Sequence, residues 1–420
     1  MKSSTSSIPS VERRNAPPGH SWLPFTQMGT FRAGERTFVS ASGTTLVDAR
    51  GHRTFDAVSS IWTCIHGHCH PRIVEAIAAQ ARRLDHATTL GATNPVAEEL
   101  AERLCAATGM SRAFFSSDGA SAVEAALKMA LQYWRNAGEP QRTRFVHLRA
   151  SYHGDTTGCM SVSDIEAFRR NFEAVCFESL TYGEARTTLE RDDVAAVIVE
   201  PIVQAAAGMQ LVPRAAYDAL RLPMRPLLIV DEIATGFGRT GALFAFTQLD
   251  LRPDLLCLGK GITGGTLALS ATLTSRRIFE AFLSDSPSDL RHFLHGHSYA
   301  GNPIACAAAL ASLALFDEER TLEQVAASAR HLETLLRQLS PDGRVREVRQ
   351  AGLMCGIVLR EEALPPRSAA VTKSWGVVDE LYRRGHFTRP IGDVVQLVPP
   401  LVTTNEEVER FLEAFGESLA

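Results

Sequence analysis

The chain has 420 residues, of which 45% are hydrophobic and 21% are charged, and its mean hydropathy is -0.03. A chain of this length and composition can form two or three domains with large cores, so it needs neither disulfides nor metal ions for stability. The 43 Lys and Arg residues and 47 Asp and Glu residues give a net charge of -4, which offers no general attraction for nucleic acid or an anionic membrane. A small-molecule ligand is therefore expected.

Residues 1–20 are polar and lack the apolar stretch of a signal peptide, so they are predicted to form a flexible tail. The longest apolar runs, such as Val194–Val199, are far too short to cross a membrane. The eight cysteines contain no CxxC pair and lie mostly in apolar runs, which is typical of a reducing compartment. We therefore expect a cytoplasmic protein.

Residues 66–315 alternate short apolar runs with longer helical patterns, of which Ser121–Arg135 is the clearest. This alternation predicts an α/β fold, in which a large, doubly wound and mostly parallel sheet is covered by helices on both faces. The predicted strands are Arg112–Ser116, Arg144–Leu148, Ala195–Glu200, Leu227–Asp231, Leu255–Leu258 and Leu269–Thr274.

A smaller α+β domain is predicted for residues 316–420. Residues 21–65 are too few for a core of their own, so they are expected to pack with it. The strands expected in these two segments are 37–39, 45–47, Val345–Leu359 and His386–Val398. The expected helices are Ile304–Phe316, which leads into the domain, Leu322–Leu339, Ser374–Arg384 and one that opens at Thr403 and Thr404 with Glu406 and Glu407 as capping-box partners.

The chemically most informative segments are two buried strands that each lead to a charged residue. Leu227–Asp231 ends at a carboxylate, and Lys260 closely follows Leu255–Leu258. The carboxyl ends of parallel strands face the ligand crevice of a doubly wound sheet. An acid and an amine at that edge suit pyridoxal phosphate, because the amine can bond to the cofactor aldehyde while the acid keeps the pyridine nitrogen protonated.

Two other interpretations fit these segments. Asp231 and Lys260 can instead be a structural ion pair, but the glycines around Lys260 favour close approach of a flat ligand. Gly236–Gly241 also matches the GxGxxG dinucleotide motif of a nicotinamide dehydrogenase. Asp231 and Glu232 precede those glycines, and their charge would oppose a bound pyrophosphate. The cofactor-binding lysine site is therefore the preferred hypothesis.

Further candidates follow other predicted strands. Gly119 and Ala120 open a helix after Arg112–Ser116, where free N–H groups and the helix dipole favour phosphate. Tyr152 follows Arg144–Leu148 and is placed to stack on a planar ring. Ser298 lies in a glycine-rich turn and offers a hydroxyl for a phosphate. His66, His68, Cys69 and His70 lack a second ligand pair at zinc-site spacing, so no metal site is predicted.

Taken together, Asp231, Lys260, the Gly119–Ala120 turn and Tyr152–Asp155 resemble the class III branch of the fold type I, pyridoxal-phosphate-dependent aminotransferases, from about residue 20 to the C-terminus. Within that branch the sequence is similar to the aminotransferases of biotin synthesis that convert 8-amino-7-oxononanoate to 7,8-diaminononanoate. The segments that carry this closer likeness are Trp22–Met28, Ser59–Gly67, Ala130–Trp134, Asp231–Gly241 and His295–Ser298.

The resemblance implies a role for each candidate residue and an obligate homodimer with its active sites at the subunit interface. Lys260 would bond to the cofactor, Asp231 would face the pyridine nitrogen and Tyr152 would stack on the ring. Phosphate would be bound by Gly119, Ala120 and Ser298, the last from the second subunit. The implied substrate contacts are Phe25, Trp62, Tyr152, Asp155, Gly296 and Arg389, with Arg389 binding the carboxylate.

Two departures from the family pattern leave the amino donor open. Members that use S-adenosylmethionine carry Tyr at the position of Phe25 and a second Trp at the position of Ile61. Those groups suit a cationic donor through a hydroxyl and a cation–π contact. Part of the family shares the pattern found here, and for that part the resemblance implies lysine as the donor. A related class III transaminase with another keto acid or diamine is the alternative, and a non-catalytic binding protein is opposed by the intact Lys260 and Asp231.

Overall fold

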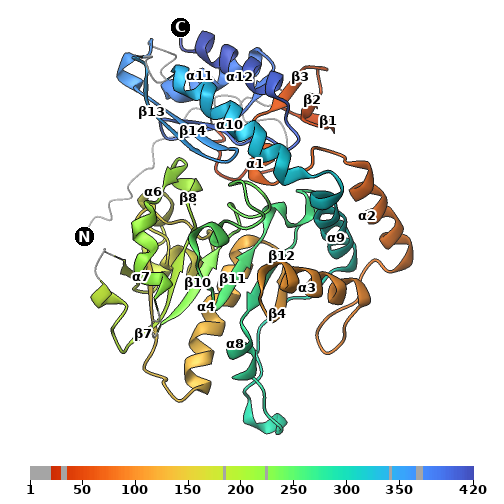
Figure 1. The fold of residues 1–420 in the computed structure, drawn as a ribbon, viewed down its shortest axis with the longest axis vertical. Coiled ribbons are helices and arrows are strands. Elements are labelled where there is room, and N and C mark those ends of the chain that lie inside the picture. Colours follow the sequence, from red (N-terminus) through yellow and green to blue (C-terminus); the bar gives the residue numbers. More distant parts are fainter. Residues whose placement is uncertain (1–19, 30–35, 183–185, 223–225, 340–342, 366–371) are drawn as a thin grey trace, which may run out of the picture.

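The structure is a computed structural model that describes residues 20–29, 36–182, 186–222, 226–339, 343–365 and 372–420. A seven-stranded sheet forms the centre of the larger part, and two four-stranded sheets with three long helices lie beside it (Figure 1). Within the described part of the chain, no helix is both long and apolar enough to span a membrane. Residues 1–19 of the predicted tail lie outside the described residues.

The central sheet has the strand order β4-β12-β11-β10-β7-β5-β6. Four of its pairings, from β11 through β10, β7 and β5 to β6, are parallel, whereas β12 is antiparallel to both of its neighbours. The mostly parallel α/β fold predicted from the sequence is thus confirmed. The strands are β4 Arg112–Ser116, β5 Arg144–His147, β6 Leu180–Thr181, β7 Val194–Val199, β10 Leu227–Asp231, β11 Leu255–Leu258 and β12 Ser270–Thr274.

Both faces of the central sheet are buried, which explains why its strands are continuous apolar runs. Along β10, Leu227 and Ile229 pack with helix α4 (Gly119–Asn136), while Leu228 and Val230 belong to the core on the opposite face. The other helices in residues 59–318 are α1 Ser59–Trp62, α2 Pro71–Arg83, α3 Pro95–Thr108, α5 Thr157–Ser161, α6 Glu166–Arg169, α7 Asp218–Arg221, α8 Arg276–Glu280 and α9 Pro303–Glu318. A short ribbon pairs β8 Val203–Gln204 with β9 Gln210–Leu211.

The second part of the molecule joins segments from both ends of the chain. The strands β1 (Phe38–Ser42), β2 (Thr45–Asp48) and β3 (Arg53–Asp56) form an antiparallel meander. Strand β15 (His386–Phe387) then pairs with β3 in parallel, with His386 opposite Phe55. Residues near both ends of the chain thus share one sheet, as expected for the N-terminal segment. The domain boundaries at residues 65 and 315 stay a prediction.

The remaining sheet corrects two of the predicted strands. Val345–Leu359 is not one strand but a hairpin of β13 (Val345–Ala351) and β14 (Met354–Leu359), because Gly352 at φ +58° turns the chain. The predicted strand His386–Val398 is divided into β15, β16 (Pro390–Ile391) and β17 (Val394–Leu397). Pro390 lacks a backbone donor and begins β16, and Gly392 at φ +58° turns the chain between β16 and β17.

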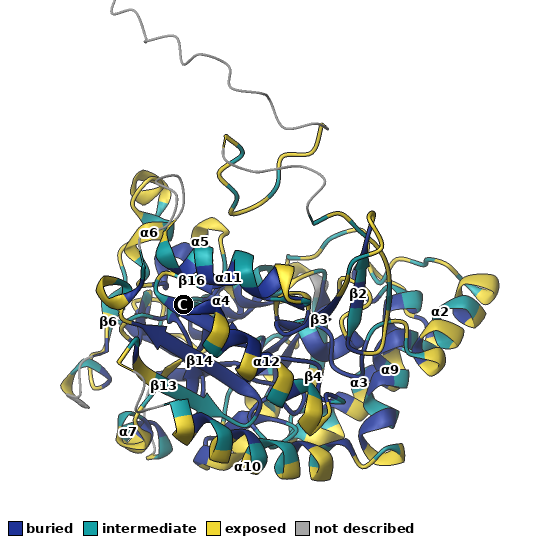
Figure 2. Cartoon of the chain, turned by 90° about the horizontal axis from the view of Figure 1, so that it is seen from above, coloured by how far each residue is buried: buried dark blue, intermediate teal, exposed yellow. Residues whose placement is uncertain are grey.

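Three helices cover these sheets: α10 Thr321–Leu339, α11 Lys373–Arg383 and α12 Asn405–Ser418. Figure 2 shows that α10 has exposed outer positions, and its buried Val325, Leu332 and Leu336 repeat along one face. Helix α12 begins with a capping box between Thr404 and Glu407, so Glu407 rather than Glu406 is the partner.

The hairpin turn of β13 and β14 yields a stability test. A Cβ at Gly352 would lie 2.5 Å from the carbonyl oxygen of Arg239, whereas one at Gly392, also at φ +58°, would meet nothing within 4 Å. Gly392→Ala should cost about 1 kcal/mol, the usual penalty of a left-handed alanine, and Gly352→Ala should cost clearly more because the backbone must also shift. Equal shifts in the midpoint of thermal unfolding would contradict the clash.

Candidate active site

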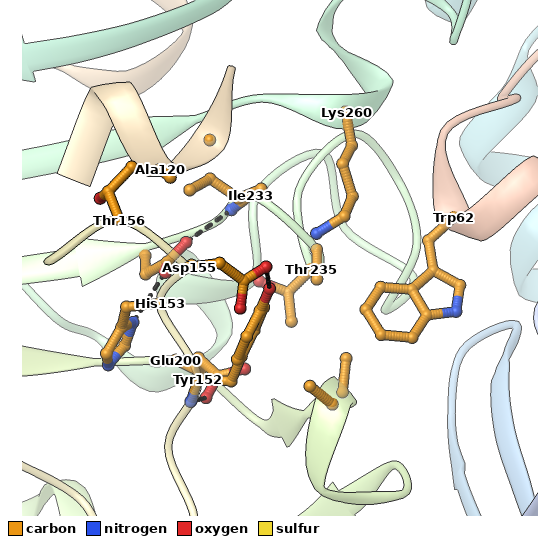
Figure 3. A pocket seen from close by; sticks show the side chains of 16 residues that line it. Trp62, Ala120, Tyr152, His153, Asp155, Thr156, Glu200, Ile233, Thr235 and Lys260 are labelled. Atoms are coloured by element: carbon orange, nitrogen blue, oxygen red, sulfur yellow. Dashed lines mark hydrogen bonds and ion pairs between the residues drawn. The ribbon is translucent and has the colours of Figure 1, made fainter. Parts of the chain in front are cut away.

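A cavity of about 370 Å³ lies at the edge of the central sheet where the parallel strands end. It receives side chains that follow β5, β7, β10 and β11 and the first residues of helix α4 (Figure 3). Its lining consists of Trp62, Gly119, Ala120, Tyr152, His153, Gly154, Asp155, Thr156, Glu200, Ala205, Ala206, Asp231, Ile233, Ala234, Thr235 and Lys260.

The cavity brings together most of the residues that the sequence selected. Those that line it are Trp62, Gly119, Ala120, Tyr152, Asp155, Asp231 and Lys260. Those that do not line it are Phe25, Gly296, Ser298 and Arg389. The juxtaposition of Asp231 and Lys260 was inferred from the ends of two strands, and the pairing of β10 with β11 produces it.

Asp231 is the last residue of β10 and is almost completely buried. Its carboxylate accepts a hydrogen bond from the Ile233 backbone N–H at 3.0 Å and pairs with His153 Nδ1 at 2.7 Å. The other ring nitrogen of His153, Nε2, is buried and has no partner among the described residues. A buried carboxylate held in this way is stiff, and its orientation is set before any ligand arrives.

Lys260 follows Gly259 at the end of β11 and opens a short 3-10 turn, Lys260–Thr263. Its amine points into the cavity in Figure 3 and lies 5.0 Å from the ring centre of Trp62. Burial lowers the pKa of Lys260, opposed by Asp231 and Glu200 and assisted by Arg239. A lowered pKa increases the neutral, nucleophilic fraction of the amine.

Tyr152 and Asp155 form one wall of the cavity. The Tyr152 hydroxyl donates to Asp155 Oδ2 at 2.8 Å, and the backbone N–H of Tyr152 donates to Glu200 Oε2 at 3.0 Å. Burial, reinforced by Asp231, raises the pKa of Glu200 well above its usual value, although hydrogen bonds and Lys260 oppose that rise. Sequence reasoning missed His153 and Glu200, although Glu200 ends a predicted strand just as Asp231 does.

The N-terminus of helix α4 forms a further side of the cavity. Asp118 caps the helix by accepting a hydrogen bond from the Ser121 N–H at 3.0 Å. None of the hydrogen bonds within the described residues uses the N–H of Gly119 or Ala120. Two free amide donors at the positive end of an 18-residue helix suit an anion.

Phe25 does not line the cavity itself but packs against Phe168, whose ring contacts the lining residue Tyr152. It is 59% exposed, and its ring lies 5.4 Å from Phe168, which in turn lies 5.6 Å from Tyr152. Phe25 was expected to contact the substrate, but within the single chain it does not line the cavity. Phe168, on helix α6, was not anticipated from the sequence.

Arg389 is linked to the cavity through Gln396. The Trp62 indole donates to Gln396 Oε1 at 2.7 Å, and Gln396 Nε2 donates to the Arg389 carbonyl at 3.0 Å. The Arg389 guanidinium lies 6.0 Å from the Trp375 ring, and no carboxylate among the described residues pairs with it. Burial, assisted by Arg36, lowers the pKa of Arg389.

Gly296 and Ser298 lie on an exposed loop together with two prominent apolar side chains, Leu294 and Tyr299. Leu294 is 68% exposed and Tyr299 is 67% exposed. This loop contributes nothing to the cavity of its own chain.

The two alternative motifs have structural explanations. Gly236–Gly241 leads into a short 3-10 turn rather than a long helix, and the buried Arg239 within it donates to the carbonyls of Pro399 and Cys64. Each histidine near residue 68 has its own partner: His66 contacts the Ser312 carbonyl, His68 contacts Asp56 and His70 contacts Glu319.

The fold and this cavity belong to a known class of enzymes. Residues 32–419 match the family model described as aminotransferase class-III. The chain is therefore a member of the class III aminotransferase family.

Individual proteins give a closer comparison than the family model does. The chain is 40% identical to the adenosylmethionine-8-amino-7-oxononanoate aminotransferase of Anoxybacillus flavithermus, over 95% of this chain and 94% of that protein. The crystal structure of the enzyme with the same name from Methanocaldococcus jannaschii superposes with a TM-score of 0.88 at 36% identity, covering 95% of this chain and 96% of that one. A PLP-bound amine transaminase from an uncultivated Pseudomonas species matches at 33% identity with a TM-score of 0.85, covering 96% and 99%.

A buried acid beside the site predicts a pH effect on stability. Burial raises the pKa of Glu232 from 4.5 to about 7, despite hydrogen bonds from Phe246, Ala245 and Thr235. The folded protein therefore binds the Glu232 proton more tightly than the unfolded chain does. The stability that this difference contributes is fully present below pH 4.5 and is lost as the pH rises to about 7. Across that window Glu232→Gln should gain roughly 3 kcal/mol relative to the unchanged chain.

Denaturant midpoints measured at several pH values test this expectation, with the exposed Glu102→Gln on α3 as the matched control. If the difference in denaturant midpoint between Glu232→Gln and the unchanged chain did not vary between pH 4.5 and about 7, the expectation would be contradicted.

Proposed function

We propose that the cavity binds pyridoxal 5'-phosphate and that Lys260 bonds to its aldehyde. The observation that carries this proposal is that a buried acid, Asp231, and the amine of Lys260 line one cavity. The residues present fit the cofactor: the Asp231 carboxylate suits a protonated ring nitrogen, the free amides of Gly119 and Ala120 suit a phosphate, and Tyr152 offers an aromatic face.

The bound cofactor supplies an electron sink for the pair left when a proton leaves the carbon next to the transferred nitrogen. Once the nitrogen of the amino donor has replaced it on the cofactor, the freed Lys260 amine, with its lowered pKa, would serve as the base that takes this proton and the acid that returns it at the other carbon. His153 and the Ile233 N–H hold the Asp231 carboxylate in place, so a positive ring nitrogen meets a fixed negative charge. Trp62 and Tyr152 exclude water from the reacting atoms.

The proposed reaction is amination of the ketone of 8-amino-7-oxononanoate, which yields 7,8-diaminononanoate for biotin synthesis. The names of the relatives support this substrate. Arg389 supports it as well, because its half-buried guanidinium has no carboxylate partner among the described residues and suits the acid end of the substrate. Trp62, Tyr152 and Asp155, which line the cavity, complete the proposed substrate contacts, and Phe25 is proposed as a further contact from outside this lining.

Two amino donors are compatible with the proposal. The names of the relatives specify S-adenosylmethionine. Phe25 and Ile61 lack the hydroxyl and the second indole that would favour that cation, which supports lysine instead. A pocket that loses a hydrogen-bonding hydroxyl can change its preference by orders of magnitude, so the donor has to be measured.

The proposed assembly is a cytoplasmic homodimer in which Gly296 and Ser298 serve the site of the second subunit. The exposed Leu294 and Tyr299 beside them support an interface, because large apolar side chains gathered on a surface loop favour burial against a partner. All eight cysteines are free thiols, which agrees with a reducing compartment.

The cofactor proposal predicts a spectroscopic loss in Lys260→Ala. The purified protein with added pyridoxal phosphate should show visible absorbance, and borohydride should attach the cofactor to Lys260. The chain has only four lysines, at positions 2, 128, 260 and 373, so peptide mapping assigns the attachment without ambiguity. Lys128→Ala, an exposed control, should keep the absorbance. Attachment at another lysine, or absorbance that survives in Lys260→Ala, would refute the assignment.

The substrate proposal predicts formation of diamine from 8-amino-7-oxononanoate with S-adenosylmethionine or with lysine, each offered separately. Arg389→Ala should raise KM for the keto acid by about tenfold or more, since a charge-assisted bidentate contact is worth over 1.4 kcal/mol, and should leave the visible absorbance unchanged. Arg383→Ala on helix α11 is the control. No product with either donor would exclude this substrate and favour another keto acid or diamine.

A further inference from the structure

The segment that presents Trp62 to the cavity is a left-handed turn built without glycine. Ser59, Ser60, Ile61 and Trp62 have φ values of +50°, +47°, +66° and +65°. Such angles are unfavourable for residues with a Cβ, and most unfavourable for a β-branched residue such as Ile61. Four in succession persist only where the surroundings hold them in place.

This turn determines where the Trp62 ring lies. The Trp62 N–H donates to the Val58 carbonyl at 2.8 Å, and the indole N–H donates to Gln396 at 2.7 Å. Trp62 as a whole is 6% exposed, and the centre of its ring lies 5.0 Å from the Lys260 amine. A relaxed turn would direct the indole elsewhere and open this side of the cavity.

One anchor of the turn is Asp56, which is completely buried. Its Oδ1 accepts a hydrogen bond from the Val58 N–H at 3.3 Å, and its Oδ2 accepts one from the Ser60 hydroxyl at 3.1 Å. The same Oδ2 pairs with His68 Nε2 at 2.8 Å. Asp56 therefore contacts the turn on one side and the imidazole on the other.

His68 is itself fixed by its backbone. Its N–H donates to the Gly43 carbonyl at 2.6 Å, and the Gly43 N–H donates to the His68 carbonyl at 3.0 Å. Gly67, immediately before it, approaches Gly43 so closely that a Cβ there would lie 3.0 Å from the Gly43 Cα. The imidazole thus reaches Asp56 from a rigid β-bridge to the turn between β1 and β2.

We propose that the Asp56–His68 pair is a positioning device that holds the left-handed turn and keeps the Trp62 ring against the cavity. Neither residue lines the cavity, so both act through Trp62. The positioning role stands on the contacts of this chain, whereas its kinetic consequence rests on the proposed aminotransferase function.

The charge state of His68 agrees with this role. Burial lowers its pKa, but the hydrogen bond to Asp56 and the contact with the Cys64 thiol outweigh burial and raise the pKa to about 10. His68 is therefore a cation at neutral pH, paired with the Asp56 carboxylate. The buried Arg239 also interacts electrostatically with Asp56.

The test compares His68→Ala with His331→Ala in the cofactor-loaded protein. His331 pairs with Glu409 at 2.7 Å between α10 and α12, so its variant removes a similar pair far from the cavity. The first readout is acrylamide quenching of Trp62 fluorescence, with a Trp62→Phe background subtracted. His68→Ala should lose the protection of Trp62, and His331→Ala should retain it.

The second readout is kinetic. His68→Ala should raise KM for the keto substrate by about tenfold while kcat falls much less and the visible absorbance persists, because Lys260 and Asp231 are intact. Adding Ile61→Gly to His68→Ala should partly restore KM and protection, since glycine adopts the left-handed conformation without strain. Ile61→Gly alone reports the direct effect of that change.

The outcomes separate the two proposals. Protection of Trp62 lost only in His68→Ala supports the positioning role even if the keto substrate is never aminated. Unchanged quenching and unchanged KM in His68→Ala would overturn it. Should that variant fail to fold, His68→Gln keeps a hydrogen-bond donor without the charge, and full protection of Trp62 with an unchanged KM in this variant would refute a role for the ion pair.

Discussion

The parallel pairing of β10 with β11 is the constraint on which the site depends. It sets Asp231 directly beside Cys257, and Lys260 follows three residues later at the same edge of the sheet. Both strands are buried on both faces, so a slip of one residue would exchange every side chain between two packed cores. The acid and the amine therefore reach one cavity through backbone hydrogen bonds, before any ligand is present.

The surroundings of this edge strengthen the charges placed there. Asp231, Glu200 and Lys260 line the same cavity inside the protein, so the charge of each affects the pKa of the others more strongly than it would at the surface. Burial of these groups costs stability, and the large apolar cores on both faces of the sheet offset the cost. The perturbed pKa values of Lys260 and Glu200 in one cavity are typical of a functional site.

The sequence predicted the sheet and seven of the sixteen residues that line the cavity, because both depend on local patterns. Apolar runs that end in a charge revealed β10 and β11, and a small-residue turn before a periodic helix revealed Gly119. The sequence carries no signal where tertiary contacts determine the backbone conformation. At Ser59–Trp62, for example, no glycine indicates the left-handed turn. The partnership of His153 with Asp231, 78 positions apart, could not be inferred from either local pattern. The roles proposed for Gly296 and Ser298 would require a second chain, because neither residue lines the cavity of its own chain.

The sheet shared by β3 and β15 has a consequence for biosynthesis. His386 pairs with Phe55 across about 330 residues of chain. At a translation rate of roughly 5–20 residues per second, the N-terminal meander waits on the order of tens of seconds after its own synthesis for its partner strand. During that interval the outer edge of β3 offers unpaired backbone groups, which favour association with other chains. Folding of this region is therefore completed late in translation or after it, and the nascent chain has a specific point at which a chaperone would be useful.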